Sequence, residues 1–422
     1  MSKVYLINLL ARVLRLLTQL GIVVLVGRKI GISNSYDKYV LILTYINAAG
    51  MLTFTMNSEI HRPDYIKLID TKPSELGKFF FSNILSSLVL YFLFIAVFSF
   101  YVVEIGLPFY LMAIFGTLAP ISTHILIILN SRLITYHQEF YNVFLSLILI
   151  PVYFLKINDL SILLIVFITQ QVGTLLIAIF LLKRKLTSLI MFKDLLKIKL
   201  NFNFIQLLPT YILSQGYNIV EKNLLSKTTG QISIVHYSQL LRTSIQSLFT
   251  SLIQSIYIPT KIQTKNKNNS DSLYFLIALI CVMFLGELIL STAFPGSLGE
   301  IIFGKKEELF TALLKRTFYL VIVIFAYVFF TAIILIQSKK LYTKISFVAQ
   351  IITFLIIAYP GISLLERIFI APMVGHSISV LFIVIQNISD TSIDRSKSIK
   401  QLITYLLLLT FLSVAYIGLE PI

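Results

Sequence analysis

Two arginines lie inside an apolar segment near the start of the chain. The stretch NLLARVLRLLTQLGIVVLV, residues 8–26, is long and apolar enough to cross a bilayer, yet it contains Arg12 and Arg15. A guanidinium in hydrocarbon costs about 2.5–3.5 kcal/mol on insertion scales. Two explanations stay open: the side chains snorkel to the interface or pack, or, with Gln19 on the same helical face, they line a wet cavity that holds an anion. Two arginines one turn apart form a fork suited to phosphate, so we favour the anion site.

A second row of polar residues runs along the predicted span 232–260. His236, Gln239, Arg242 and Gln246 follow each other at three- and four-residue steps, while leucines and isoleucines occupy the other faces. Such a row must face another helix or a cavity. Interhelical hydrogen bonds explain part of it, but Arg242 is hard to satisfy in that way. We therefore favour a row that lines a cavity.

The preceding predicted span, 204–226, carries Glu221, the candidate ligand for a coupling ion. Asn218 and Glu221 lie on one side of the segment 204–226. Glu221 either binds a coupling ion, Na⁺ or H⁺, together with Asn218, or is an interfacial carboxylate. Its neighbour Lys222 points about 100° away on a helix and need not pair with it. Cation exporters usually need a carboxylate in the cavity, and the first six predicted spans carry none well inside the membrane; Glu287, in the ninth, receives no role.

The composition indicates a membrane protein. Of the 422 residues, 57% are hydrophobic and 13% charged, against about 25% charged in an ordinary soluble domain. The net charge of +16 comes from short basic clusters between apolar runs, so we expect no nucleic-acid partner. A single cysteine, Cys281, and five histidines without metal spacing predict neither disulfides nor a metal site. No GxxxxGK[ST], HExxH or GxSxG motif occurs, so we expect no catalytic residue, no cofactor and no enzyme activity.

Apolar runs of membrane-spanning length set the predicted architecture. About thirteen such runs of roughly 18–25 residues occur, at 4–26, 38–58, 79–103, 107–130, 133–155, 160–182, 204–226, 232–260, 272–294, 315–337, 345–362, 366–387 and 401–418. Lys and Arg favour one set of loops by roughly two to one, which predicts a cytoplasmic N-terminus. The N-terminal segment has no small-residue cleavage site, so we expect it to be retained. With thirteen spans the C-terminus is outside; one helix more or fewer would reverse that.

A basic amphipathic segment divides the chain. The stretch 184–203 combines apolar residues with lysines, as in segments that lie on an anionic membrane surface. We expect an all-α polytopic protein of about 12–14 transmembrane helices, built as two six-helix bundles, a plan shared by many transporters. The predicted parts are an N-terminal bundle at 1–183, the linker at 184–203, a C-terminal bundle at 204–387, and a loop with an additional helix at 388–422.

Several stretches resemble the lipid II flippases (MurJ/MviN). GQISIVHYSQLLRTSIQSLFTSLIQSIYIPTKIQ, residues 230–263, is similar to their spans seven and eight, with Tyr237 and Pro259 at matching distances. LPTYILSQGYNIVEKNLLS places Glu221 at the family's acidic position. LLARVL, and GISNSYDKYVLILTYIN with Asp37 and Tyr39, resemble its first two spans. The family's arginine in span eight falls at Leu240, two residues before Arg242. The wider superfamily that this resemblance points to also includes the Wzx-type flippases for O-antigen and capsule units, whose sequences are more variable.

The resemblance implies a fold, a substrate and a place in the cell. The fold would be that of the MOP (MATE-like) superfamily, with two bundles around a central site. The substrate would be an undecaprenyl-pyrophosphate-linked oligosaccharide, a surface-polysaccharide unit or a lipid II-like precursor, moved from the cytoplasmic to the outer leaflet of the bacterial inner membrane by an ion gradient or the membrane potential. Expected partners are this lipid-linked saccharide, membrane lipids and other polysaccharide-assembly membrane proteins. The pyrophosphate and sugar would contact Arg12, Arg15, Gln19, His236, Gln239, Arg242 and Gln246.

Two rival classes are kept in view. A multidrug or cation antiporter of the same superfold would need a cavity carboxylate, for which Glu221 and Glu287 are the candidates. A polysaccharide polymerase or ligase would be expected to carry a large outer loop with catalytic side chains. The longest predicted outer loop here, 295–314, is short and holds none.

Overall fold

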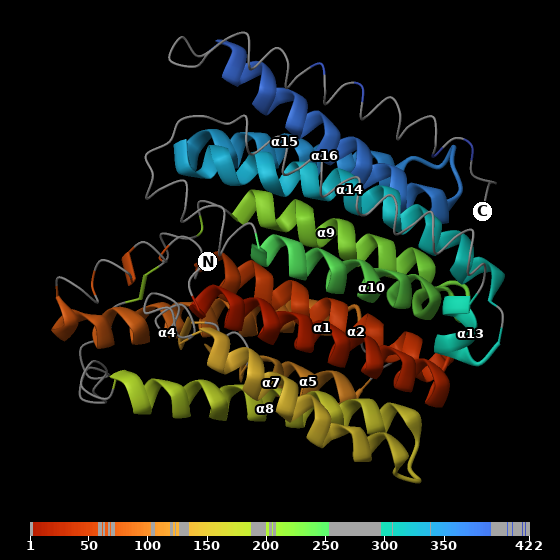
Figure 1. Cartoon of the computed structure of the whole chain (residues 1–422), viewed down its shortest axis with the longest axis horizontal. Helices are drawn as coiled ribbons and strands as arrows, with labels where there is room; N and C mark the ends of the chain where they lie inside the picture. The colour runs from red at the N-terminus through yellow and green to blue at the C-terminus, as the bar shows by residue number, and fades with distance from the viewer. Residues whose placement is uncertain are drawn as a thin grey trace. The chain divides into compact units, whose positions relative to one another are not determined.

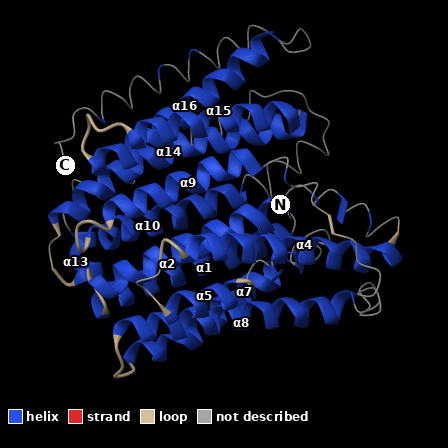
Figure 2. Cartoon of the chain, turned by 180° about the vertical axis from the view of Figure 1, so that it is seen from behind, coloured by secondary structure: helices blue, strands red, loops and turns tan. Residues whose placement is uncertain are grey.

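The structure is a computed structural model. It describes the continuous stretches 3–57, 72–102, 106–118, 135–186, 208–252, 297–305, 307–337 and 339–389, and shorter pieces between and after them, among them 61, 64–65, 124–125, 200–201 and 416. Across these residues every regular element is a helix, as the all-α prediction requires (Figure 2). The elements are α1 (Lys3–Lys29), α2 (Asn34–Gly50), the π-helix η1 (Met51–Thr55), α4 (Pro73–Ser99), α5 (Leu107–Gly116), α7 (Thr135–Leu149), the 3₁₀-helix η3 (Ile150–Phe154), α8 (Asp159–Leu186), α9 (Leu208–Leu225), α10 (Gln231–Leu252), α13 (Ser297–Phe303), α14 (Glu308–Gln337), α15 (Lys339–Ala358) and α16 (Leu364–Ser389).

Most predicted spans coincide with these helices, and local chemistry explains several of the ends. The hydroxyl of Ser33 accepts from the backbone N–H of Tyr36 at 3.2 Å and starts α2. Pro73 starts α4 six residues before the predicted span, because proline suits the first helical turn. The predicted span 272–294 lies outside the described residues, as does most of 184–203 and 401–418.

One predicted loop is helical. The stretch 295–314, expected as an outer loop, contains α13 and the first turns of α14. Glu300 and Glu308 lie in the first turns of these two helices, where the positive end of the helix dipole favours a carboxylate. The span prediction missed this because hydropathy locates apolar runs and not polar helical ends.

The surface is that of a multi-pass membrane protein. Three described helical segments are long and apolar enough to cross a bilayer: Glu75–Ser99, Asp159–Leu182 and Leu364–Phe382. Large apolar side chains on α4, such as Phe92, Leu93 and Val97, are exposed, and the helix carries charged residues only near its start. An apolar face of this extent is unfavourable in water and suits contact with lipid.

Internal contacts divide the chain into two compact units, Met1–Ser233 (unit 1) and Ile234–Ile422 (unit 2). Unit 1 contains α1 to α9 and the start of α10. In it α7 packs between α1 and α8, and α2 packs on α4, α5, α8 and α9 (Figure 1). Its core collects buried residues of α2, η1, α4, α5 and α8, among them Ile42, Phe54, Tyr91, Phe109 and Phe167. The predicted six-plus-six division stays a prediction.

Unit 2 is built around α16, which packs along α15 and α14 (Figure 1). The two helices α15 and α16 approach closely at Gly375, where an added Cβ would meet the carbonyl oxygen of Ala349 at 2.8 Å. Thr353 satisfies its hydroxyl locally by donating to the same carbonyl at 2.9 Å. A small residue at this contact lets the backbones come together, as is usual between membrane helices.

Candidate functional site

The predicted anion site lies partly within the described residues. Arg12 and Arg15 are both on α1, and Arg15 and Gln19 are half-buried. The opposite face of α1 is apolar and exposed, with Leu10, Leu14 and Leu17 at helical spacing. The side chain of Arg12 lies outside the described residues. The anion-binding role of these residues stays a prediction.

The second predicted row lies on α10. His236 and Gln239 are half-buried, while the side chains of Arg242 and Gln246 lie outside the described residues. Tyr237 and Ser238, between them, are fully buried. Because α1 and this part of α10 belong to different units, the predicted meeting of their arginines is untested.

The start of α10 is held by a carboxylate from α2. Asp37 is 7% exposed and accepts hydrogen bonds from the backbone N–H of Gly230 at 2.6 Å and of Ser233 at 2.8 Å, and from the Ser233 hydroxyl. An acidic side chain beside the unpaired N–H groups of a helix N-terminus satisfies them and complements the helix dipole. We call this group of Asp37, Gly230 and Ser233 the Asp37 clasp.

Backbone geometry makes the clasp specific. Gly230 has a φ of +87°, and a Cβ there would meet Cγ2 of Ile32 at 2.6 Å.

Further along α2, the Tyr45 hydroxyl and the Asn223 amide of α9 form hydrogen bonds of 2.9 and 3.1 Å. The predicted loops 27–38 and 227–231, which a cytoplasmic N-terminus would place on the outer side, thus meet at one end of unit 1. Which side of the membrane this end faces stays a prediction.

Glu221 and Lys222 pair with each other. The Lys222 ammonium lies 2.7 Å from Oε1 of Glu221, and the side chains of Lys222 and Glu221 are 6% and 1% exposed. The sequence argument that neighbours on a helix need not pair underestimated the long lysine arm, which folds back because an unpaired charge is costly to bury. A cation bound by Glu221 would have to share the carboxylate with this ammonium. The roles of Glu221 and Asn218 as ion ligands stay predictions; the Asn218 amide donates to Gln215 at 3.4 Å.

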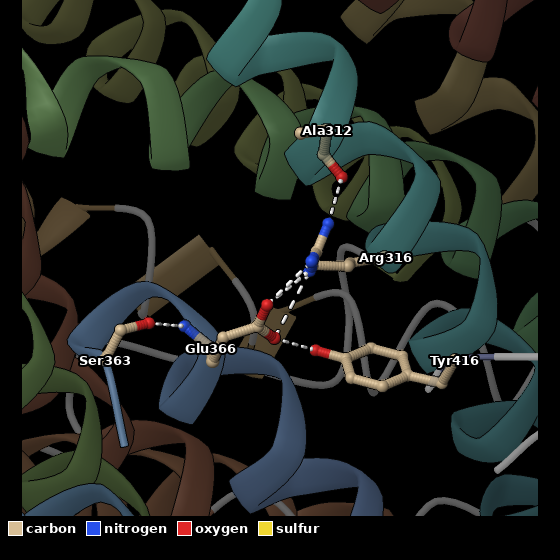
Figure 3. A network of polar contacts seen from close by, with 5 residues as sticks. All are labelled: Ala312, Arg316, Ser363, Glu366 and Tyr416. Carbon is tan, nitrogen blue, oxygen red and sulfur yellow. Dashed lines mark hydrogen bonds and ion pairs between the residues drawn. The ribbon is translucent and has the colours of Figure 1, made fainter. Parts of the chain in front are cut away.

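Unit 2 holds a buried ion pair that the sequence analysis missed (Figure 3). Nη2 and Nε of Arg316 on α14 lie 2.6 and 3.1 Å from Oε1 of Glu366 on α16, and Nε is 3.2 Å from Oε2. The Tyr416 hydroxyl donates to Oε2 at 2.6 Å, and the Ser363 hydroxyl accepts from the Glu366 backbone N–H at 3.2 Å. Arg316 is 2% exposed. The guanidinium group of Arg316 is paired with the Glu366 carboxylate, so this site connects α14, α16 and the residue Tyr416 and does not offer a free cation.

The missed residues had a weak signal. Arg316 and Glu366 lie at the starts of predicted spans, where charges are ordinary, so their pairing over 50 residues could not be read from the sequence. Asn57, Asn83 and His124 interrupt apolar runs and could have been noticed. They belong to a buried polar network in unit 1, in which the Asn57 amide donates to Ser87 and to the carbonyl of Asn83, both at 2.8 Å.

Solved structures with a similar fold include a lipid II flippase and MATE transporters. The chain superposes on "Lipid II flippase MurJ, inward closed conformation" with a TM-score of 0.62 at 16% identity, covering 98% of this chain and 92% of that one. It also superposes on the inward-facing conformation of a multidrug resistance MATE family transporter of the MOP superfamily. The TM-score is 0.51 at 10% identity, covering 98% of this chain and 96% of that one. The chain shares the fold of these structures. The bent conformation of a MATE protein gives 0.50 at 12% identity, over 98% and 95%. No protein-family model and no curated protein matches the sequence.

Proposed function

We propose that this membrane protein is a flippase for an undecaprenyl-pyrophosphate-linked oligosaccharide. It would carry the saccharide from the cytoplasmic to the outer leaflet of the bacterial inner membrane. The supporting observation is the fold: a match to a lipid II flippase over 98% of the chain, at a higher TM-score than the matches to the two MATE structures.

The arginines of α1 supply the substrate chemistry. Arg15 is half-buried on the side of α1 opposite its exposed apolar face, with Arg12 one turn away. A pyrophosphate carries several acceptor oxygens that a pair of guanidinium groups can bind bidentately. The apolar face of α1 suits the polyprenyl chain, which stays in the bilayer while the sugar crosses. Arg242, His236, Gln239 and Gln246 would complete the binding surface from α10.

The Asp37 clasp fixes one end of unit 1. With the predicted orientation it joins α2 to the start of α10 at the outer side. Transport would proceed by rocking of two bundles about a central site. The membrane potential, worth about 2.3 kcal/mol per charge per 100 mV, or an Na⁺ or H⁺ gradient would drive the cycle.

A multidrug or cation antiporter is the second candidate, favoured by the MATE matches. That chemistry needs a cavity carboxylate that exchanges cations. Glu221 is instead paired with Lys222 at 2.7 Å, which neutralises its charge. This pairing supports the flippase over the antiporter. Drug-resistance assays on Glu221→Gln and Glu287→Gln separate the two.

A charge reversal tests the proposed function in cells. In Arg12→Glu/Arg15→Glu the lipid-linked saccharide should accumulate in the inner leaflet, because two carboxylates repel the pyrophosphate. The matched control is Arg28→Glu, since Arg28 is exposed near the end of the same helix. Normal export by a well-expressed double variant would contradict the pyrophosphate role.

A further inference from the structure

The first turn of α16 holds an arginine that forms no ion pair with the described residues. Nη1 of Arg367 donates to the carbonyl oxygen of Ile357, near the end of α15, at 2.7 Å. Within the described part of the chain this is the only hydrogen bond of its guanidinium, and Nε is buried without a partner. The adjacent acid, Glu366, is already paired with Arg316 and Tyr416. Arg367 therefore carries a positive charge that these residues do not balance.

The contrast with Arg316 shows what Arg367 lacks. Arg316 on α14 holds a carboxylate with Nε and Nη2. Arg367 has instead a neutral carbonyl at a helix end, which orients the guanidinium without balancing its charge. The Arg367 side chain is half-buried, and a cation in an apolar environment is unfavourable without a counter-charge. An anion from outside the chain would supply that charge.

Arg367 lies where a membrane span begins. The segment Leu364–Phe382 of α16 is long and apolar enough to cross a bilayer, and Arg367 is in its first turn. Tyr359, which directly follows α15, is 57% exposed, and exposed tyrosines are typical of the membrane–water interface. The guanidinium is therefore at the level of the lipid headgroups, where arginines can reach phosphate groups.

An apolar stripe continues from Arg367 along the same face of α16. On a helix, the positions three, seven and eleven residues further on share a face with Arg367. Ile368, Phe369 and Ala371, on the other faces, are buried in unit 2. The stripe residues are half-buried and apolar: Ile370, Val374 and Ile378. Eleven residues of helix rise about 16 Å, which matches one leaflet of a hydrocarbon core of about 30 Å.

We propose that Arg367 and this stripe bind an anionic phospholipid. A phosphate oxygen accepts from a guanidinium N–H that the Ile357 carbonyl leaves open, and an acyl chain lies along Ile370, Val374 and Ile378. A headgroup with net negative charge, such as that of phosphatidylglycerol, balances the arginine, whereas phosphatidylcholine carries its own cation. A free phosphate ion offers the same oxygens but makes no use of the stripe. The inference concerns unit 2 alone and does not depend on the transported substrate.

Native mass spectrometry of the purified full chain, titrated with phosphatidylglycerol, tests the site. Arg367→Gln should weaken the tightest phosphatidylglycerol binding by about tenfold, because a charge-assisted hydrogen bond is lost. The matched control is Lys305→Gln, which removes an exposed cation of unit 2 that lies 3.6 Å from Glu307. The control should bind the lipid as wild type does. An unchanged affinity in Arg367→Gln, or an equal loss in Lys305→Gln, would overturn the proposal.

Two further measurements use the wild-type chain, so they decide the matter even if Arg367→Gln does not fold. Phosphatidylcholine should bind more weakly than phosphatidylglycerol, and inorganic phosphate at the same concentration should not displace the lipid. Displacement by inorganic phosphate would show a site for a free ion and overturn the proposal. In nanodiscs, a phosphatidylglycerol with a photoreactive acyl chain should label α16 between Ile370 and Ile378. Labelling that is absent from this stretch would likewise overturn it.

Discussion

The carboxylate of Asp37 on α2 caps the start of α10 by accepting a hydrogen bond from the backbone N–H of Ser233, 196 residues further along the chain. The capping residue of α10 is thus supplied by α2, not by the chain just before it. A local cap would stabilise the start of α10 alone, whereas this one also fixes the start of α10 to α2. The stability of unit 1 is therefore expected to depend on this side chain.

Replacing Asp37 should destabilise unit 1. Asp37→Ala leaves two N–H groups without their acceptor, at a cost of about 1–3 kcal/mol per buried group. Asp37→Asn keeps one oxygen but turns an NH₂ group toward one of the donors, so it should rescue little. Thermal unfolding in detergent measures both variants. The control Asp159→Asn, in the first turn of α8, should stay within about 0.5 kcal/mol of wild type; an equal loss there would contradict the clasp.

Gly230→Ala should destabilise the protein by more than the backbone strain of an alanine at positive φ alone. At φ +87° an alanine costs about 1–2 kcal/mol, and its Cβ also strikes Ile32. Gly304→Ala, at φ +73° in open space, carries the backbone strain without the collision. Unfolding temperatures should therefore fall further for Gly230→Ala, and Ile32→Ala in the same chain should recover part of the difference. Equal effects at the two glycines would show that the Ile32 contact is unimportant.

The pair of Glu221 and Lys222 should be sensitive to half-removal. Lys222→Met leaves a buried carboxylate uncompensated, which typically costs about 3–5 kcal/mol. The double variant Glu221→Gln/Lys222→Met removes both charges and should recover most of the stability. A double-mutant cycle on purified protein gives the coupling. Additive effects of the two changes would mean that the 2.7 Å contact contributes no stability.

The ion pair between Arg316 and Glu366 in unit 2 should contribute more stability than the hydrogen bond from Tyr416 to the same carboxylate. Arg316→Met strands Glu366 among buried groups and should cost about 3–5 kcal/mol. Tyr416→Phe removes one hydrogen bond to the carboxylate and should cost about 1.5–3 kcal/mol. Chemical denaturation ranks the two variants. A larger loss for Tyr416→Phe than for Arg316→Met would contradict the leading part assigned to the arginine.

The helices were predictable because their signal is local. Apolar runs gave the positions of α1, α4, α8 and α16, since a lipid-facing helix must be apolar along its whole length. The first turns of α14 and the whole of α13 were missed, because they are polar and lie at helix ends. Charge bias gave an orientation that brings predicted outer loops together at the Asp37 clasp.

The site was less predictable because its contacts are long-range. Asp37 drew attention only through a resemblance, and its partners lie 193 and 196 residues away. Nothing in the spacing of Arg316 and Glu366 announces a pair. The adjacency of Glu221 and Lys222 left their pairing open, since neighbours on a helix point about 100° apart. The length of the lysine side chain and the burial of both groups bring them together.

The most direct measurement is translocation in proteoliposomes. A fluorescent undecaprenyl-pyrophosphate oligosaccharide is placed in one leaflet and its appearance in the other is followed with a membrane-impermeant quencher. Wild type and Arg28→Gln should move the lipid, whereas Arg12→Gln/Arg15→Gln should lose at least most of the rate. Translocation that is unchanged in the double variant, or that is absent from folded wild type under every imposed gradient, would contradict a pyrophosphate site on α1.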